Sequence, residues 1–94
     1  MWESDDILVF KDTNPKAPKH VLLVPKKHIE SLAKVSDLDK EVLGNLMRSA
    51  KTVAKKLGIE KAFRLEIYNG RDAGQTVMHL HVHLLGGWKE SQKH

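Results

Sequence analysis

Residues 78–85 alternate between histidine and apolar side chains, and this pattern limits what the chain can fold into. The apolar alternate positions are Leu80, Val82 and Leu84, and the histidines are His79, His81 and His83. Successive side chains of a β-strand point to opposite faces of a sheet, so a period of two indicates a strand with two unlike faces. We predict that the apolar face meets the core and that the three imidazoles stand in a row, roughly 6.5–7 Å apart.

Two kinds of site fit three imidazoles in a row. A neutral histidine, whose reference pKa is about 6.5, can attack phosphorus and form a covalent phosphoryl-imidazole that water then releases. Such a nucleophile needs an acceptor for its far nitrogen, donors for the phosphate oxygens and an acid for the leaving group. Alternatively, His-x-His on a strand is a familiar zinc pair that a third histidine can complete.

The residues around the histidines bear on this choice. Backbone amides near Gly74 and Gln75 could form an anion-binding nest, and the Thr76 hydroxyl precedes His79 by three residues. Metal sites usually add carboxylates that orient the imidazoles, whereas the nearest acid before the motif is Asp72. The spacing therefore favours a nucleophile and leaves a metal site as the alternative.

Composition restricts the class of protein. The 94 residues suffice for one domain with a core, and the 40% apolar content is typical of a globular chain. The absence of cysteine excludes disulfides and cysteine-bound zinc, and it fits a cytoplasmic protein. The net charge of +4 suggests an anionic partner, but the two Phe, one Tyr and two Trp are too few for a typical nucleic-acid surface. No apolar run approaches the roughly 20 residues that span a bilayer and no signal-peptide pattern is visible, so we expect no membrane partner.

Short β-rich runs separated by turn residues predict the other strands of the sheet. They are residues 7–11, 21–24 and 62–68, with a strand remnant at residues 2–4. Pro25 ends the second run, and we expect a short helical turn near residues 29–32. The loop of residues 69–75 is rich in turn formers and returns the chain antiparallel into the histidine strand.

Apolar residues at helical spacing between residues 37 and 57 predict one long amphipathic helix. The Ser36 hydroxyl can cap its first turn, and the acidic residues that follow favour the positive end of the helix dipole. Gly58 suits the position after the last turn. The sequence thus predicts an α+β fold, in which an antiparallel sheet of four to five strands carries one long helix, in a single domain over residues 1–94.

The histidine run and its surroundings resemble the histidine triad (HIT) superfamily, and within it the Hint-like purine nucleoside phosphoramidases. The likeness covers roughly residues 3–87. It is carried by residues 5–10 and 14–18, by Leu-Val-Pro-Lys-Lys-His at 23–28, by Ala-Gly-Gln-Thr-Val at 73–77, by the histidine run and by Gly86-Gly87. Together these motifs are highly specific for the superfamily.

The resemblance implies catalytic roles for five residues. His81 would be the nucleophile that takes the nucleotidyl group, and the backbone carbonyl of His79 would hold its far nitrogen. The His79 side chain would pair with His28. His83 and Thr76 would contact the phosphate and the leaving group.

The resemblance also implies a set of residues that bind the nucleotide. Asp12 would bind the ribose hydroxyls, and Phe10 would line the base pocket. The residues along the phosphate and sugar would be Asn69, Gly74, Gln75 and Val77. His20 and His94 match no functional position of the pattern, and we expect both at the surface.

The implied reaction is hydrolysis of the P–N bond of adenosine 5′-phosphoramidates through a covalent nucleotidyl-histidine intermediate, with no metal and no cofactor. The implied partner is a purine nucleotide such as AMP. The implied assembly is a homodimer whose two sheets join into one, with the long helices at the seam. The alternatives are a dinucleoside polyphosphate hydrolase or nucleotidyl transferase of the same superfamily, and a non-catalytic nucleotide-binding protein.

The chain departs from the family pattern at both ends. Family members usually carry a segment ahead of the first strand whose apolar side chains cover the nucleobase, and this chain starts at about the end of that segment. A Trp-Pro-Pro run is common in the family's C-terminal tail, whereas no proline follows Trp88 here. The resemblance therefore implies neither a base preference nor a leaving-group preference.

Overall fold

The computed structural model describes residues 2–89 and shows one antiparallel sheet with the strand order β1-β2-β3-β5-β4. The strands are β1 (Trp2–Glu3), β2 (Ile7–Lys11), β3 (Lys19–Pro25), β4 (Phe63–Glu66) and β5 (Val82–Gly86). Each neighbouring pair is antiparallel. The predicted sheet of four to five strands is therefore confirmed at five, and residues 2–4 do contribute a short edge strand.

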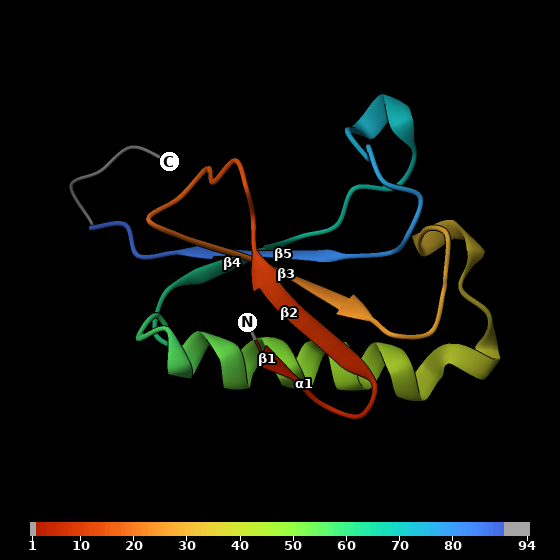
Figure 1. The fold of residues 1–94 in the computed structure, drawn as a ribbon, viewed down its shortest axis with the longest axis horizontal. Helices are drawn as coiled ribbons and strands as arrows, with labels where there is room; N and C mark the ends of the chain where they lie inside the picture. Colours follow the sequence, from red (N-terminus) through yellow and green to blue (C-terminus); the bar gives the residue numbers. More distant parts are fainter. Residues whose placement is uncertain (1, 90–94) are drawn as a thin grey trace.

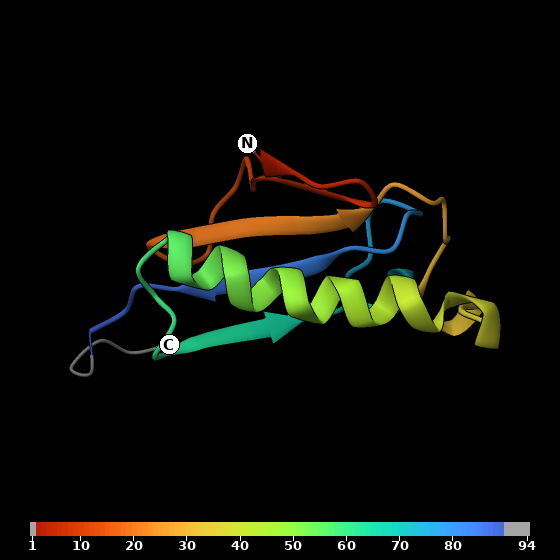
Figure 2. The same cartoon turned by 90° about the horizontal axis from the view of Figure 1, so that it is seen from below.

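The helix α1 (Lys40–Lys56) runs across one face of the sheet, as Figure 1 and Figure 2 show from two directions. Its apolar stripe packs against the strand residues that point to the same side. The buried residues of this core include Ile7, Val9, Val21, Leu23, Leu46, Ala50, Val53, Ala54, Val82 and Leu84. One face of the sheet thus belongs to the core, which leaves the opposite face for a site.

The beginning and end of α1 follow the predicted signals. Ser36 accepts a hydrogen bond from the backbone N–H of Leu38, and the Asp39 side chain accepts one from the N–H of Ser36. This reciprocal capping box satisfies two amides that a helix start leaves without partners. Residues 37–39 form a 3₁₀ turn, so the α-helix begins three residues later than predicted. At the other end Gly58 adopts φ +74°, the left-handed conformation expected after the last turn.

The strand register determines which side chains share the face of the sheet opposite α1. Phe10 pairs with Leu22, Leu22 pairs with His83, and His83 pairs with Glu66. Residues that pair across antiparallel strands share a face, so these four side chains form a row across β2, β3, β5 and β4. His20 lies on the same face because its partner in β5 is Leu85, two residues from His83.

The histidine strand is shorter than predicted, because β5 begins at Val82 and leaves His79 and His81 ahead of it. The last pair with β3 is Leu23 with Val82, near the end of β3 at Pro25, which has no N–H to continue the ladder. The amide of Leu80 bonds instead to the carbonyl of Ile29, at 2.6 Å. The predicted separation of faces nevertheless holds, since Leu80, Val82 and Leu84 are all buried in the core.

Two other boundaries differ from the prediction. The strand expected over residues 62–68 is limited to Phe63–Glu66, which is as far as β5 pairs with it. The helical turn expected at residues 29–32 is instead a 3₁₀ turn at Leu32–Lys34, because Ile29 is buried and its carbonyl holds the Leu80 amide. No helix among residues 2–89 combines the length and apolar character needed to cross a membrane.

Candidate active site

A cavity of about 370 Å³ opens on the face of the sheet opposite α1. It is lined by residues of β2, β3, β5 and the loop that leads into β5. They are Phe10, Asp12, Thr13, Leu22, Val24, Tyr68, Gly74, Thr76, Val77, His79, His81 and His83. Eight of the predicted site residues therefore meet at one place, namely Phe10, Asp12, Gly74, Thr76, Val77, His79, His81 and His83.

His81 has a defined orientation and a defined proton position. Its Nδ1 atom lies 2.7 Å from the backbone carbonyl oxygen of His79, two residues earlier. A carbonyl can only accept, so Nδ1 carries the proton and donates it to this bond. In the neutral ring Nε2 then carries the lone pair, which is the tautomer that a nucleophilic histidine requires. The predicted contact between the His79 carbonyl and His81 is present.

His79 anchors the segment to β3. Its Nε2 atom lies 2.8 Å from the carbonyl oxygen of Pro25, to which it donates. The ring of His28 meets the His79 ring edge-on, with 4.9 Å between their centroids. The predicted pairing of His28 with His79 is thus a ring contact, whereas the hydrogen bond goes to Pro25.

The expectation that His20 lies at the surface is wrong, because its side chain is buried. The backbone N–H of Lys16 donates to Nδ1 of His20 at 3.0 Å. On the other side of the ring, Nε2 of His20 lies 2.9 Å from Nδ1 of His83 and 3.4 Å from a carboxylate oxygen of Asp12. His20 is therefore a fourth histidine behind the cavity. His94, the other histidine expected at the surface, lies outside the described residues.

His83 is enclosed on several sides. Its ring lies 5.1 Å from that of His81 and 4.7 Å from that of Tyr68, and the Tyr68 hydroxyl donates to Glu66 at 2.6 Å. Burial lowers the pKa of His83, and the neighbouring His81 and His20 lower it further. The Nε2 atom of His83 is buried without a hydrogen-bond partner among the described residues. Such an atom is unusual and points to a ligand or to a role in chemistry.

Two predicted binding residues have other partners. The buried amide of Gln75 donates to the carbonyls of Glu30 and Val77 and accepts from the N–H of Gly70. The Asn69 side-chain oxygen accepts from the N–H of Ala33. Neither side chain lines the histidine cavity. Both instead hold the loop before β5 to its neighbours.

One group of described residues has the geometry to hold a metal ion. Asp12, His20 and His83 each present a ligand atom, and these three atoms all lie within 4.8 Å of one another. Tetrahedral ligands at zinc distances of about 2.0–2.1 Å are about 3.3 Å apart, which is close to the spacing of these atoms. His79 and His81, which the sequence places in the same row, are not part of this group.

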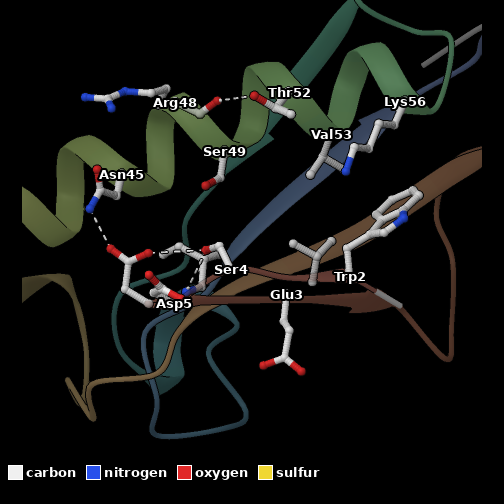
Figure 3. A pocket seen from close by; sticks show the side chains of 13 residues that line it. Trp2, Glu3, Ser4, Asp5, Asn45, Arg48, Ser49, Thr52, Val53 and Lys56 are labelled. Carbon is white, nitrogen blue, oxygen red and sulfur yellow. Dashed lines mark hydrogen bonds between the residues drawn. The ribbon is translucent and has the colours of Figure 1, made fainter.

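A second cavity of about 380 Å³ lies on the helix side of the sheet (Figure 3). Residues 2–6 form one wall, and the Asn45, Arg48, Ser49, Thr52 and Lys56 side chains of α1 form the other. The amide of Asn45 donates to Asp6, and the ammonium of Lys56 lies 5.3 Å from the Trp2 ring centroid. No histidine lines this cavity, which distinguishes it from the cavity lined by His79, His81 and His83 on the opposite face.

Sequence reasoning missed His20 and Tyr68. His20 stands in an apolar strand next to Val21, so alternation alone places it on one of the two faces. Only the register between β3 and β5 shows that this face is the one that carries His83. Tyr68 follows β4 and lines the cavity because the loop that contains it returns the chain to β5. No local sequence pattern predicts this position.

Comparisons with known proteins agree with this arrangement. A family model described as "HIT domain" matches residues 1–90. An uncharacterized HIT-like protein of Synechocystis is 53% identical over 87 residues, which cover 93% of this chain and 76% of that protein. A maize protein named "14 kDa zinc-binding protein" is 44% identical over 89 residues, covering 93% of this chain and 70% of its own.

A solved structure extends the agreement to three dimensions. The chain is similar to a HIT family hydrolase from Legionella pneumophila, with a TM-score of 0.92 and 40% sequence identity. The match covers 97% of this chain and 82% of that one. Since a single family model accounts for nearly the whole chain and the fold agrees with a solved member, the chain belongs to the HIT family.

Proposed function

We propose that this protein hydrolyses the P–N bond of adenosine 5′-phosphoramidates through a covalent nucleotidyl intermediate on His81. The observation that carries this proposal is the hydrogen bond from Nδ1 of His81 to the His79 carbonyl, which leaves the Nε2 lone pair free at the wall of the cavity. The likeness to a HIT family hydrolase supports hydrolysis, and the P–N bond is the finer part of the proposal.

The reaction proceeds in two displacements at phosphorus. In the first, Nε2 of His81 forms a bond to phosphorus, the P–N bond of the substrate breaks, and the amine leaves after taking up a proton from solvent. In the second, water attacks phosphorus and loses a proton to solvent, which balances the proton used in the first step. The bond to His81 then breaks to release AMP and regenerate the imidazole. His83 and Thr76 line the same cavity and supply the hydrogen-bond donors for the phosphate oxygens and the leaving group.

The rest of the cavity suits a nucleoside. Phe10 is 42% exposed although it is a large apolar residue, and it offers a surface for a base. Asp12 presents a carboxylate at the cavity wall that can accept from ribose hydroxyls. Gly74 and Val77 border the region where the phosphate and sugar would lie. His28 acts through its contact with the His79 ring.

We further propose that two copies pair through β4. This strand ends the sheet, so one of its edges has no strand beside it among the described residues. Phe63 and Leu65 of β4 are large apolar residues, and each is 37% exposed. Pairing of two β4 edges would bury them and join the sheets. Leu65→Lys is expected to shift the protein from dimer to monomer in sedimentation equilibrium, with the exposed Lys34→Ala as a control outside α1 and β4. A monomeric wild type would contradict this.

A metal-binding function is the second candidate. It is favoured by the geometry of Asp12, His20 and His83 and by the name of the maize relative. Equilibrium dialysis against Zn²⁺ distinguishes the two functions. A stoichiometric, tightly held ion that is lost in His20→Ala supports metal binding.

The experiment that tests the enzymatic proposal measures amine and AMP release from an adenosine 5′-phosphoramidate. Wild type, His81→Ala and Lys51→Ala are assayed together, and acid-quenched wild type is analysed for a nucleotidyl adduct on His81. Faster release from a dinucleoside polyphosphate than from the phosphoramidate would instead support the polyphosphate hydrolase. Tight AMP binding without turnover of either substrate would support a non-catalytic binding protein.

A further inference from the structure

The position of one backbone amide determines the proton positions of His20, behind the cavity, and of His83, which lines it. The N–H of Lys16 points at Nδ1 of His20 across 3.0 Å, so Nδ1 must present its lone pair. An imidazole that keeps one nitrogen unprotonated carries its proton on the other. His20 is therefore protonated at Nε2.

The tautomer of His20 in turn determines the tautomer of His83. Nε2 of His20 lies 2.9 Å from Nδ1 of His83, and one of the two atoms must donate. If His83 donated, both nitrogens of His20 would have to accept, which only an imidazolate could do. Nε2–H of His20 is thus the donor, and Nδ1 of His83 is the acceptor. The Asp12 carboxylate oxygen, 3.4 Å from the same Nε2, adds attraction for this proton.

The chain of bonds ends at a single unpaired donor. Because Nδ1 of His83 accepts, the neutral ring carries its proton on Nε2, and this atom has no partner among the described residues. The ring of His83 lines the histidine cavity beside His81. A buried N–H without an acceptor is unfavourable, and a substrate oxygen placed against it would remove that cost.

We propose that His20 is a positioning residue that holds His83 as an Nε2–H donor to a non-bridging phosphoryl oxygen of the substrate. The proposal rests on the proposed phosphoryl chemistry at His81 and assigns His83 the role of a neutral donor in place of a base. His20 does not relay protons, because its far nitrogen is occupied by the Lys16 amide. Its contribution is to select one tautomer of His83.

The first test determines the tautomers of His20 and His83 in the absence of substrate. Long-range ¹H–¹⁵N correlation spectra of protein labelled at histidine distinguish protonated from unprotonated ring nitrogens. We expect wild type to show His83 protonated at Nε2 and His20 protonated at Nε2. In His20→Ala, His83 is expected to become a mixture of tautomers. Protonation of His83 at Nδ1 in the wild type would overturn the proposal, whatever the activity of the protein.

The second test measures the kinetic consequence. His20→Ala is expected to lower kcat/KM on a phosphoramidate by about 10²-fold, mostly through kcat, which is the scale for loss of one preorganised donor to developing charge. His20→Gln, whose amide N–H can still donate to Nδ1 of His83, is expected to recover most of this loss. Equal losses in both variants would overturn the proposal.

A matched control separates positioning from packing. Leu85 is the buried register partner of His20, so Leu85→Ala opens space at the same place without removing a hydrogen bond to His83. We expect it to lower stability while the tautomer of His83 is unchanged. A tautomer shift in Leu85→Ala as large as in His20→Ala would show that His20 acts only through packing.

Zinc that copurifies with wild type at one equivalent and is lost in His20→Ala would also overturn the proposal, since His20 would then be a ligand. If wild type hydrolyses no phosphoramidate, the proposed function fails, and the spectra still decide the tautomers.

Discussion

The backbone carbonyl of His79 lies 2.7 Å from Nδ1 of His81, so the peptide unit two residues before the central histidine determines which of its nitrogens is free. A carbonyl is a permanent acceptor, and it therefore holds the ring in one tautomer and one orientation. Ser-His-Asp enzymes use a carboxylate to orient histidine in a similar way. Here the acceptor is a backbone carbonyl of the same segment, just before β5, that carries the histidine.

His81→Ala is expected to lower phosphoramidate turnover by at least about 10³-fold, because no other side chain in the proposed mechanism bonds to phosphorus. His81 precedes β5 and is not among the buried core residues, so the far-ultraviolet circular dichroism and the urea midpoint should stay close to wild type. Turnover by the variant within ten-fold of wild type would exclude His81 as the nucleophile.

Chelation is expected to leave turnover unchanged, because the proposed reaction uses the His81 lone pair and involves no metal. Protein dialysed against EDTA and protein that was not dialysed should have the same kcat on a phosphoramidate. A loss of activity that added Zn²⁺ reverses would show that Asp12, His20 and His83 hold a metal that the reaction needs.

The stability of the fold is expected to fall on the acidic side of neutrality because of His83. Burial holds the pKa of His83 below the value of about 6.5 in an unfolded chain. The unfolded chain therefore binds the proton more readily, and the slope of unfolding free energy with pH is positive. The contribution of His83 is fully present above about pH 6.5 and is lost as the pH falls through its folded-state pKa.

Urea unfolding midpoints measured between about pH 8 and pH 5 check this expectation. His83→Gln removes the titrating group, so its midpoint should depend less steeply on pH than that of wild type. Parallel curves for the two proteins would show that other groups cause the dependence.

Ser36→Ala is expected to lower the free energy of unfolding by about 1 kcal/mol. The substitution removes the acceptor for the Leu38 amide and one half of the capping box with Asp39. Asp39 keeps its bond from Lys27, which also holds the pKa of the Asp39 carboxyl below its usual value. Urea denaturation measures the loss, and Ser36→Thr, which retains the hydroxyl, should lie much closer to wild type.

Gly86→Ala is expected to destabilise the fold by about 1–3 kcal/mol. A Cβ atom at this position would lie 2.7 Å from Cδ1 of Ile59 and 3.1 Å from the backbone oxygen of Ala62. The matched control is Gly44→Ala, because a Cβ at Gly44 would meet nothing within 4 Å and alanine favours a helix. Thermal unfolding of both variants should therefore give opposite changes, and a stabilised Gly86→Ala would contradict the close packing at β5.

Local patterns in the sequence predicted the features that depend on neighbouring residues. The period of two assigned Leu80, Val82 and Leu84 to the core, and the Ser36 cap and Gly58 marked the ends of the long helix within a turn. The contact between the His79 carbonyl and His81 came from the resemblance to the family, but it joins residues two apart and needs no distant partner.

The tertiary structure decided whatever depends on pairing between distant segments. The length of β5 is set by where β3 ends, and the burial of His20 is set by the register that places it beside His83, 63 residues away. The Gln75 and Asn69 side chains, which suit a phosphate site by their chemistry, are instead occupied by backbone groups of residues 30 and 33. The sequence by itself determined which face carries the histidines, because side-chain alternation is a local property. Only the fold decided that His20 meets His83 and which ring nitrogen of each carries the proton, because their hydrogen-bond partners come from distant segments of the chain.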